Sequence, residues 1–354
     1  MQLKGKAAII SAILLLSIAV GIFFFRDEVV SLINKKTNSE GSLSMIEKLT
    51  PEIEELSKQI RLDPNNAQLI FNRADQYFVN NNLKYALLDY KKAYHIDSTN
   101  QTFVIGLADC YFEVNYPDSS ILVLETFLKH DPNNIDVLMD AAIDYFLLPS
   151  PKHTIALDKL NSILKIDIQN SEAYFYRGLI LKETGDTLAA IRSFQTAVET
   201  NPDYYDAYMQ LGLLYADRKD PVAVKYFENA IALNDTSNEA AYAKAKFMQD
   251  HGNLGDAIEY YKNIITRNPQ DADALYNLAT IYYGIDSIEK AYRMFDLAIK
   301  QDPAKPEAYF GKGLCAEELN KPDEAISFYK QALNLNPNYT DAEEQLNKLK
   351  QEQQ

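Results

Sequence analysis

The sequence predicts an all-α solenoid of about eight helix-turn-helix repeats, preceded by a single-pass transmembrane helix. Three observations support this prediction. Proline recurs at multiples of about 34 residues, small and aromatic residues recur at fixed places in the same period, and a stretch of 19 residues near the N-terminus carries no charge. A fixed period of this length is typical of stacked repeats, in which each unit buries its apolar face against its neighbours.

The composition excludes several classes of protein. Apolar residues make up 47% of the 354 residues and charged residues 24%, as is usual for a folded chain. The net charge of −15 argues against nucleic acid as a partner, because binding to a phosphate backbone requires a basic surface. The 2 cysteines cannot form a disulfide framework, and a four-ligand zinc site would also need several of the 4 histidines.

Residues 7–25 are predicted to anchor the chain in a membrane, after a short basic N-terminus at residues 1–6. A helix of this length spans about 28 Å, close to the thickness of the bilayer core. A cleaved signal peptide is the alternative, because Ala19 and Gly21 precede a possible cleavage point. Cleavage there would leave an apolar new N-terminus, which favours the uncleaved anchor. Residues 26–44 are mostly polar and are expected to form a linker.

The basic residues on the two sides of the anchor nearly balance, so they set its orientation only weakly. Lys4 and Lys6 precede the apolar stretch, whereas Arg26, Lys35 and Lys36 follow it. We expect the short N-terminus to lie inside the cell and the large body outside the cytoplasm, in the periplasm if the protein is bacterial.

The repeats are located by the spacing of the prolines at residues 64, 132, 202, 269, 303 and 337. Aligning the sequence on this spacing gives eight units over residues 67–339: 67–100, 101–134, 135–170, 171–204, 205–237, 238–271, 272–305 and 306–339. Residues 45–66 are expected to form an N-terminal half-repeat or cap, and residues 340–354 a C-terminal capping helix. The third repeat has two extra residues near Pro149 and Pro151, and the fifth is one residue short.

Each place in the repeat, called a slot and counted from the first residue of the unit, holds one kind of side chain. Slot 8 is small in every repeat: Ala74, Ala108, Ala142, Gly178, Gly212, Ala245, Ala279 and Gly313. Slot 24 is aromatic or leucine: Tyr90, Leu124, Leu160, Phe194, Phe227, Tyr261, Phe295 and Tyr329. We expect the small residue to let the two helices of a repeat approach and the large one to fill the space between them. Polar residues at the repeat boundaries are predicted to cap the next first helix: Asn66, Asn100, Asn134, Asn170, Ser237 and Asp271.

This pattern resembles the tetratricopeptide repeat (TPR) family, whose first helix carries Leu-Gly-Tyr and whose second carries Ala, Phe, Ala and Pro. The clearest matches are Leu211-Gly212 with Tyr215 in one repeat, and Ala190, Phe194, Ala197 and Pro202 in another. The resemblance covers residues 67–339 and implies a right-handed solenoid that binds protein segments on a concave surface. The tryptophan common at slot 4 of the family is absent, and tyrosine takes its place in some repeats.

No catalytic motif is present, so we expect the protein not to be an enzyme and to need no cofactor or metal. Gly311, Gly313 and Ala316 match a dinucleotide-binding pattern in spacing, but they lie inside a predicted helix without a preceding strand. The four histidines fall in four different repeats, which does not favour a metal site or a catalytic triad.

The resemblance places slots 2, 5, 9, 12 and 13 of the first helices on the partner-binding face. Slot 5 is apolar in all eight repeats, and slot 12 is phenylalanine in the first three. The predicted partner-binding residues are therefore Phe71, Phe78, Ile105, Phe112, Met139, Phe146 and Phe175. Burial of slot 5 against the neighbouring helix remains an alternative. Slot 2 is rich in acids, which either complement the helix dipole or contact a ligand.

These features together predict a membrane-tethered, non-catalytic scaffold that binds a partner segment in an apolar groove with an acidic rim. A protein or peptide with basic flanks would fit that groove. The alternative is an accessory subunit that packs permanently in a membrane enzyme or in a secretion or assembly complex. The lysines and asparagines that clamp chaperone C-termini in the family are absent here, which argues against that function.

Overall fold

The structure, a computed structural model, describes residues 50–352, and it confirms the predicted all-α fold for that range. The described residues form 18 α-helices and no strand. The expected anchor at residues 7–25 and the linker at residues 26–44 lie outside the described residues. Within residues 50–352, every helix is too short or too polar to cross a bilayer. The chain divides into two compact units, one up to Thr200 and the other from Asn201.

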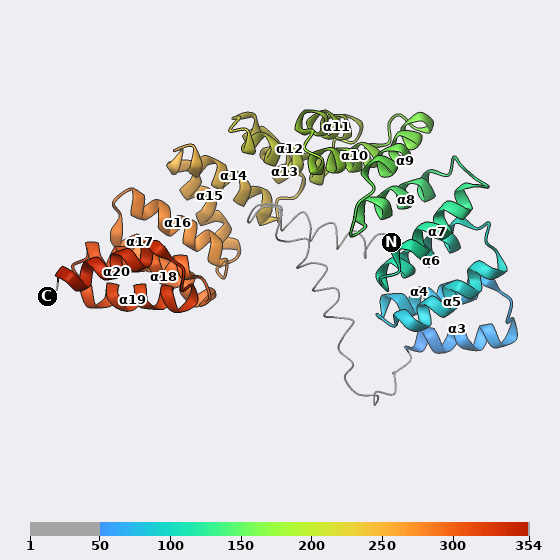
Figure 1. The fold of residues 1–354 in the computed structure, drawn as a ribbon, viewed down its shortest axis with the longest axis horizontal. Helices are drawn as coiled ribbons and strands as arrows, with labels where there is room; N and C mark the ends of the chain where they lie inside the picture. Colours follow the sequence, from blue (N-terminus) through green and yellow to red (C-terminus); the bar gives the residue numbers. More distant parts are fainter. Residues whose placement is uncertain (1–49, 353–354) are drawn as a thin grey trace. The chain divides into compact units, whose positions relative to one another are not determined.

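The first unit contains one single helix and four helix pairs, which follow one another in the blue-to-green part of Figure 1. The single helix is α3 (Pro51–Leu62). The pairs are α4 (Ala67–Val79) with α5 (Leu83–Ile96), α6 (Gln101–Glu113) with α7 (Pro117–Leu128), α8 (Ile135–Leu147) with α9 (His153–Ile166), and α10 (Ser171–Glu183) with α11 (Thr187–Thr200).

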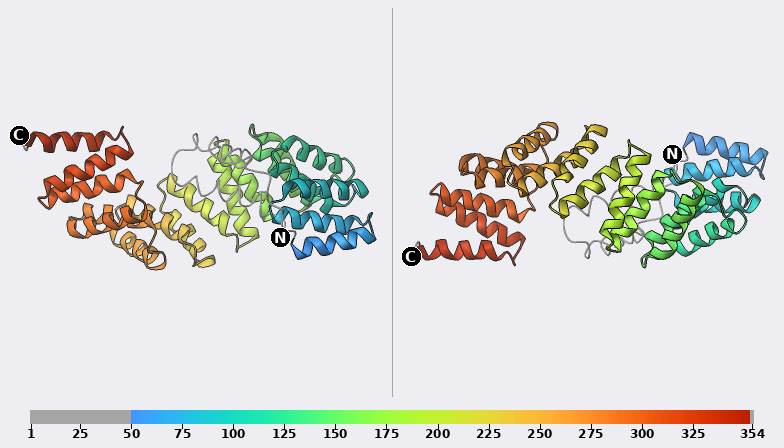
Figure 2. Two further views of the ribbon diagram at one scale, coloured as in Figure 1. Left: turned by 90° about the horizontal axis from the view of Figure 1, so that it is seen from below. Right: turned by 90° about the horizontal axis from the view of Figure 1, so that it is seen from above.

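The second unit repeats the arrangement and ends in a single helix. Its pairs are α12 (Tyr205–Asp217) with α13 (Val222–Leu233), α14 (Asn238–Asp250) with α15 (Leu254–Arg267), α16 (Ala272–Gly284) with α17 (Ile288–Gln301), and α18 (Pro306–Glu318) with α19 (Pro322–Leu335). The last helix is α20 (Thr340–Glu352). In both units each helix packs on the next one along the chain, as the two further views in Figure 2 also show.

The first helix of every pair begins at the first residue of a repeat, and a predicted cap precedes six of these eight helices. Side-chain oxygens of Asn66, Asn134, Asn170 and Asp271 accept a hydrogen bond from the backbone N–H three residues later. Asn100 and Ser237 accept one from two residues later. Each cap satisfies an N–H group that the helix itself leaves without an acceptor, so all six capping predictions are confirmed.

The turn inside most repeats contains one residue in the left-handed conformation. This residue stands at slot 15 in seven of the repeats: Asn81, Asn115, Gly185, Lys219, Gly252, Asp286 and Asn320. The next N–H then donates to the carbonyl of slot 11, as from Asn82 to Tyr77 at 2.8 Å. In the third repeat slot 15 is Pro149, whose ring fixes φ near −65°. The two extra residues there lengthen the turn, and Lys152 N–H makes the equivalent bond to the Tyr145 carbonyl at 3.0 Å.

The core of each repeat lies between its small slot 8 residue and its large slot 24 residue. Phe194, Phe227, Tyr261 and Tyr329 are each 0% exposed. A Cβ placed on Gly178 would lie 2.6 Å from the Phe194 ring, too close for any side chain. The missing side chain at Gly178 is therefore what allows α10 and α11 to pack around Phe194. Cys110 and Cys315 are free, buried thiols at slot 10, and burial raises the pKa of each to about 12.

Candidate partner-binding surfaces

The slot 5 residues among the predicted partner-binding side chains lie in the packed interior. Phe71, Ile105, Met139 and Phe175 are between 3% and 9% exposed. The Phe71 ring lies 5.1 Å from Phe103 of α6 and 5.3 Å from Tyr90 of α5. It also covers Gly106, where an added Cβ would lie 2.6 Å from the ring. Phe71 thus packs α4 on α6, and the burial of the other three residues agrees with the alternative that the sequence left open.

The slot 12 residues keep part of their surface accessible. Phe78, Phe112 and Phe146 are half-buried and recur on α4, α6 and α8, and we call them the phenylalanine row. Phe78 lies 6.2 Å from the Tyr90 ring and Phe146 lies 6.2 Å from the His153 ring. Beside Phe78, Val79 is 71% exposed. Contact of these residues with a partner stays a prediction. Within the predicted site, the phenylalanine row is the part with solvent-accessible surface, because the slot 5 residues are buried.

Carboxylates on several first helices lie in surroundings that disfavour their charge. Burial raises the pKa of Glu172, and the negative charge of Asp136 in the preceding repeat raises it further. Burial also raises the pKa of Asp75, although the Tyr90 hydroxyl donates a hydrogen bond to it at 2.6 Å. In the second unit, burial and the charge of Asp206 raise the pKa of Glu239. Cationic groups brought by a ligand would relieve this repulsion.

Residues that could supply metal or acid–base chemistry do not cluster in the described part of the chain. Between residues 50 and 352, no three His, Cys, Asp or Glu side chains are placed to hold a metal ion. Among residues 50–352, His153 lies near Glu183, with 3.5 Å between Nε2 and Oε1.

A second set of polar residues, at slot 7, was not predicted from the sequence. Arg73, Lys244 and Lys312 each extend from a first helix to acids on second helices. Lys244 donates to Glu228 at 2.7 Å and to Tyr260 at 2.6 Å, which ties α13 to α15. Lys312 donates to Asp296 of α17 at 2.6 Å and lies 4.5 Å from the Phe328 ring of α19. The sequence does contain a sign of these contacts, because a cation at a slot that is buried in other repeats needs a counter-charge.

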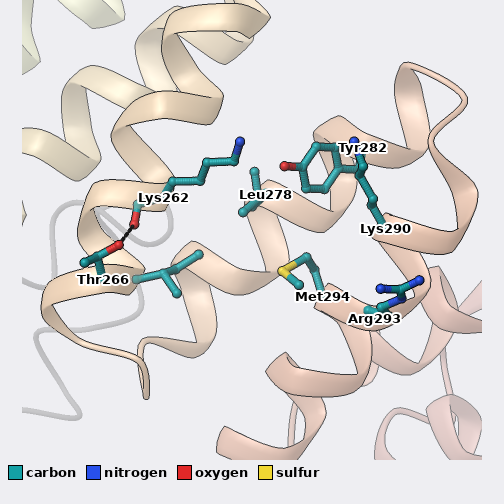
Figure 3. Close-up of a pocket in the computed structure, with 8 residues that line it drawn as sticks. Lys262, Thr266, Leu278, Tyr282, Lys290, Arg293 and Met294 are labelled. Carbon is teal, nitrogen blue, oxygen red and sulfur yellow. Dashed lines mark hydrogen bonds between the residues drawn. The ribbon is translucent and has the colours of Figure 1, made fainter.

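Two surface cavities lie beside slot 7 residues that form no ion pair within residues 50–352. In the second unit a cavity of about 400 Å³ has Leu278, at slot 7 of α16, in its wall. Figure 3 shows Lys262 of α15 on one side of Leu278, and Lys290 with Arg293 of α17 on the other. Lys290 lies 5.5 Å from the Tyr282 ring. Among residues 50–352, these three cations form no ion pair.

The first unit has a corresponding cavity of about 550 Å³ between α9 and α10. Here slot 7 is Arg177, and the other lining residues are Asp158, Asn161, Ser162, Leu164, Lys165, Ile168 and Tyr174. The Arg177 guanidinium carbon lies 4.8 Å from the centre of the Tyr174 ring. The lining therefore combines charged and polar groups with two aliphatic side chains.

Comparison with known proteins finds similarity to tetratricopeptide repeat proteins. Three tetratricopeptide repeat models match residues 175–223, 248–317 and 306–339, and the last range is also that of the eighth repeat read from the sequence. The chain is 31% identical to tetratricopeptide repeat protein 14 of Mus musculus over 29% of its own length and 14% of that protein. It is 22% identical to tetratricopeptide repeat protein 8 of Caenorhabditis elegans over 49% of its own length and 40% of that protein. The chain thus spans less than half of either relative.

A solved structure supports the fold. The C-terminal part of a TPR repeat-containing protein from Cytophaga hutchinsonii superposes with a TM-score of 0.58 at 19% identity. The match covers 67% of this chain and 97% of that one. At this level of identity the likeness concerns the fold alone.

Proposed function

We propose that residues 67–339, of which 175–223 and 248–339 match tetratricopeptide repeat models, form a non-catalytic scaffold that binds a segment of a protein partner along its first helices. Proteins built from these repeats are generally scaffolds for protein–protein interaction. The observation that carries the proposal is the phenylalanine row, which places a partly accessible aromatic side chain at the same slot of three consecutive first helices. Aromatic anchors of this kind supply much of the free energy of protein binding.

We expect the partner segment to place apolar side chains on the phenylalanine row and to carry basic residues at its flanks. Glu172 and Asp136 lie on the first helices α10 and α8, next along the chain from α4 and α6. The raised pKa of Glu172 reflects burial and the nearby charge of Asp136. A lysine or arginine of the partner would compensate both carboxylates. Binding should therefore weaken as the salt concentration rises.

Replacing Phe112 with Glu should weaken capture of the partner at least tenfold. The loss of a buried apolar contact costs about 1.5–3 kcal/mol, which corresponds to a factor of about ten or more in affinity. The measurement is co-purification of the partner with tagged full-length chain, quantified against the unsubstituted protein. Leu122→Glu is the matched control, because Leu122 lies on the second helix α7 and is 65% exposed. Equal loss with both variants, or no loss with Phe112→Glu, would count against the phenylalanine row.

A permanent subunit of a membrane complex is the second candidate. It is favoured by two exposed leucines at slot 22 of consecutive second helices, Leu88 of α5 at 57% and Leu122 of α7 at 65%. Exposed apolar residues in a row mark interaction surfaces. A permanent subunit would co-purify with its partner at fixed stoichiometry, and Leu122→Glu would then disrupt the complex more than Phe112→Glu. The scaffold would instead purify alone after mild detergent extraction.

The membrane tether belongs to the proposal as well. Residues 7–25 are long and apolar enough to span a bilayer as a helix, and we infer that the repeats lie outside the cytoplasm. Protease added to intact spheroplasts should then digest the repeats. Protection until the cells are lysed would indicate the opposite orientation. N-terminal sequencing of the mature chain distinguishes an uncleaved anchor from a cleaved signal, in which residues 1–21 would be missing.

A further inference from the structure

The same slot in two repeats of the first unit holds an arginine with very different surroundings. In the first repeat, Arg73 makes a bidentate pair with Asp89, with Nε at 2.6 Å and the second nitrogen at 2.9 Å. Its remaining nitrogen donates to the Ser57 hydroxyl at 3.1 Å. Asp89 stands at slot 23 of the second helix. Each of the three guanidinium nitrogens therefore donates to an acceptor, and Asp89 carries the compensating charge.

In the fourth repeat the acid of slot 23 is replaced by Ser193. Arg177 Nε donates to the Ser193 hydroxyl at 3.1 Å, and the guanidinium lies against the Tyr174 ring. Within residues 50–352 Arg177 forms no ion pair. Burial lowers the pKa of Arg177, because no carboxylate offsets the cost of removing the charge from water. The repeat thus keeps the cation of slot 7 and lacks its counter-charge.

Arg177 also lines the cavity of about 550 Å³ between α9 and α10. Lys165 adds a second positive charge to the lining and Asp158 one negative charge, so the lining carries a net charge of +1. A single carboxylate would neutralise it. Leu164 and Ile168 form an aliphatic part of the wall, and Ile168 is 71% exposed. The lining therefore matches a carboxylate that carries an aliphatic group.

We propose that the cavity around Arg177 is a carboxylate-binding site, in which the guanidinium takes from a ligand the counter-charge that Asp89 gives Arg73. The ligand is an aliphatic carboxylate, such as an acidic side chain or a chain terminus on a protein partner. The planar guanidinium binds a carboxylate through two parallel hydrogen bonds, as the Arg73 pair does within the chain. This site is distinct from the phenylalanine row and does not depend on it.

The test uses the full-length chain with ¹⁵N-labelled arginine, whose 8 arginines give a simple side-chain NMR spectrum. Butyrate is the probe, and butyramide is its neutral counterpart. Butyrate should shift the Arg177 Nε–H signal in a saturable manner, and butyramide should not. The Arg73 signal should stay in place, because its acceptors are already supplied by the chain. An unmoved Arg177 signal, an equal response to butyramide, or a response to inorganic phosphate without one to butyrate would each overturn the proposal.

Ser193→Asp is the decisive variant, since it restores at slot 23 the residue that the first repeat has. The new carboxylate should pair with Arg177 and weaken butyrate binding at least tenfold. Undiminished binding would overturn the proposal. If that variant does not fold, Arg177→Gln provides a second measurement. Butyrate should raise the melting temperature of the unsubstituted chain and not that of Arg177→Gln, and an equal rise in both would contradict the assignment.

Discussion

Raising the pH above about 10 should unfold the repeats in a cooperative transition. Tyr90, Tyr261 and Tyr329 are at most 3% exposed, and burial raises the pKa of each of them well above the usual value for tyrosine. In the unfolded chain the same phenols ionise near pH 10. Above that pH the folded chain holds protons that the unfolded chain has lost, so the free energy of unfolding falls as the pH rises.

The expected effect is large because the tyrosines act together. Each of the three removes about 1.4 kcal/mol of stability per pH unit above about 10, or roughly 4 kcal/mol per unit in sum. Whole domains are stable by only about 5–15 kcal/mol. Burial also raises the pKa to about 12 for five further tyrosines: Tyr145, Tyr205, Tyr242, Tyr292 and Tyr339.

Circular dichroism measures the loss of helix, and ultraviolet absorbance measures the appearance of tyrosinate. The two should change at the same pH. Tyr261→Phe should flatten the pH dependence, because it removes one of the titrating groups at the cost of a hydrogen bond to Gln249. Tyr85→Phe is the control, since Tyr85 is 42% exposed. Helix that persists after the buried tyrosines have ionised would contradict the packing described here.

Phe194→Ala should destabilise the first unit by about 3–5 kcal/mol, the usual cost of emptying a fully buried aromatic position. Gly178→Ala alone should also destabilise it, by about 1–3 kcal/mol, because the new methyl group would lie 2.6 Å from the ring. In the Phe194→Ala background the same methyl group has space. The higher helix propensity of alanine should then raise the free energy of unfolding by about 1 kcal/mol. The sign of the Gly178→Ala effect should therefore reverse.

Urea denaturation of the two single variants and the double variant measures this coupling. Gly255→Ala serves as the control, because an added Cβ at Gly255 meets no atom within 4 Å. It should leave the protein unchanged or stabilise it slightly. Additive effects of Phe194→Ala and Gly178→Ala would show that the ring does not fill the space beside Gly178.

The sequence predicts the helices well because the same boundary pattern occurs in repeat after repeat. The caps at Asn66 and Asp271 could be placed from residue type and spacing alone, since capping is a local interaction. The turn residues with positive φ could also have been predicted from residue type. Slot 15 holds Asn, Asp or Gly in most repeats, and these residues adopt positive φ most readily. Pro149 marks the one repeat that must turn in another way.

The burial of slot 5 and the surroundings of slot 7 could not be predicted in the same way. An apolar residue on a first helix is equally consistent with a groove and with packing on the next repeat, and only the distance from Phe71 to Phe103 decides between them. The different surroundings of Arg73 and Arg177 also follow from tertiary structure, because each arginine bonds to a residue sixteen positions away on another helix. Aligning slots 7 and 23 together would have revealed it.

Photo-crosslinking along the phenylalanine row tests the central proposal most directly. A photoreactive amino acid is placed in turn at positions 78, 112 and 146 of the full-length chain in cells, and at positions 88 and 122 as controls on the second helices. The scaffold proposal predicts that the first three positions label successive residues of one partner segment, with basic residues at its flanks, and that the controls do not label it. Labelling of that partner from positions 88 and 122 alone would contradict the proposal and place the binding surface on the second helices.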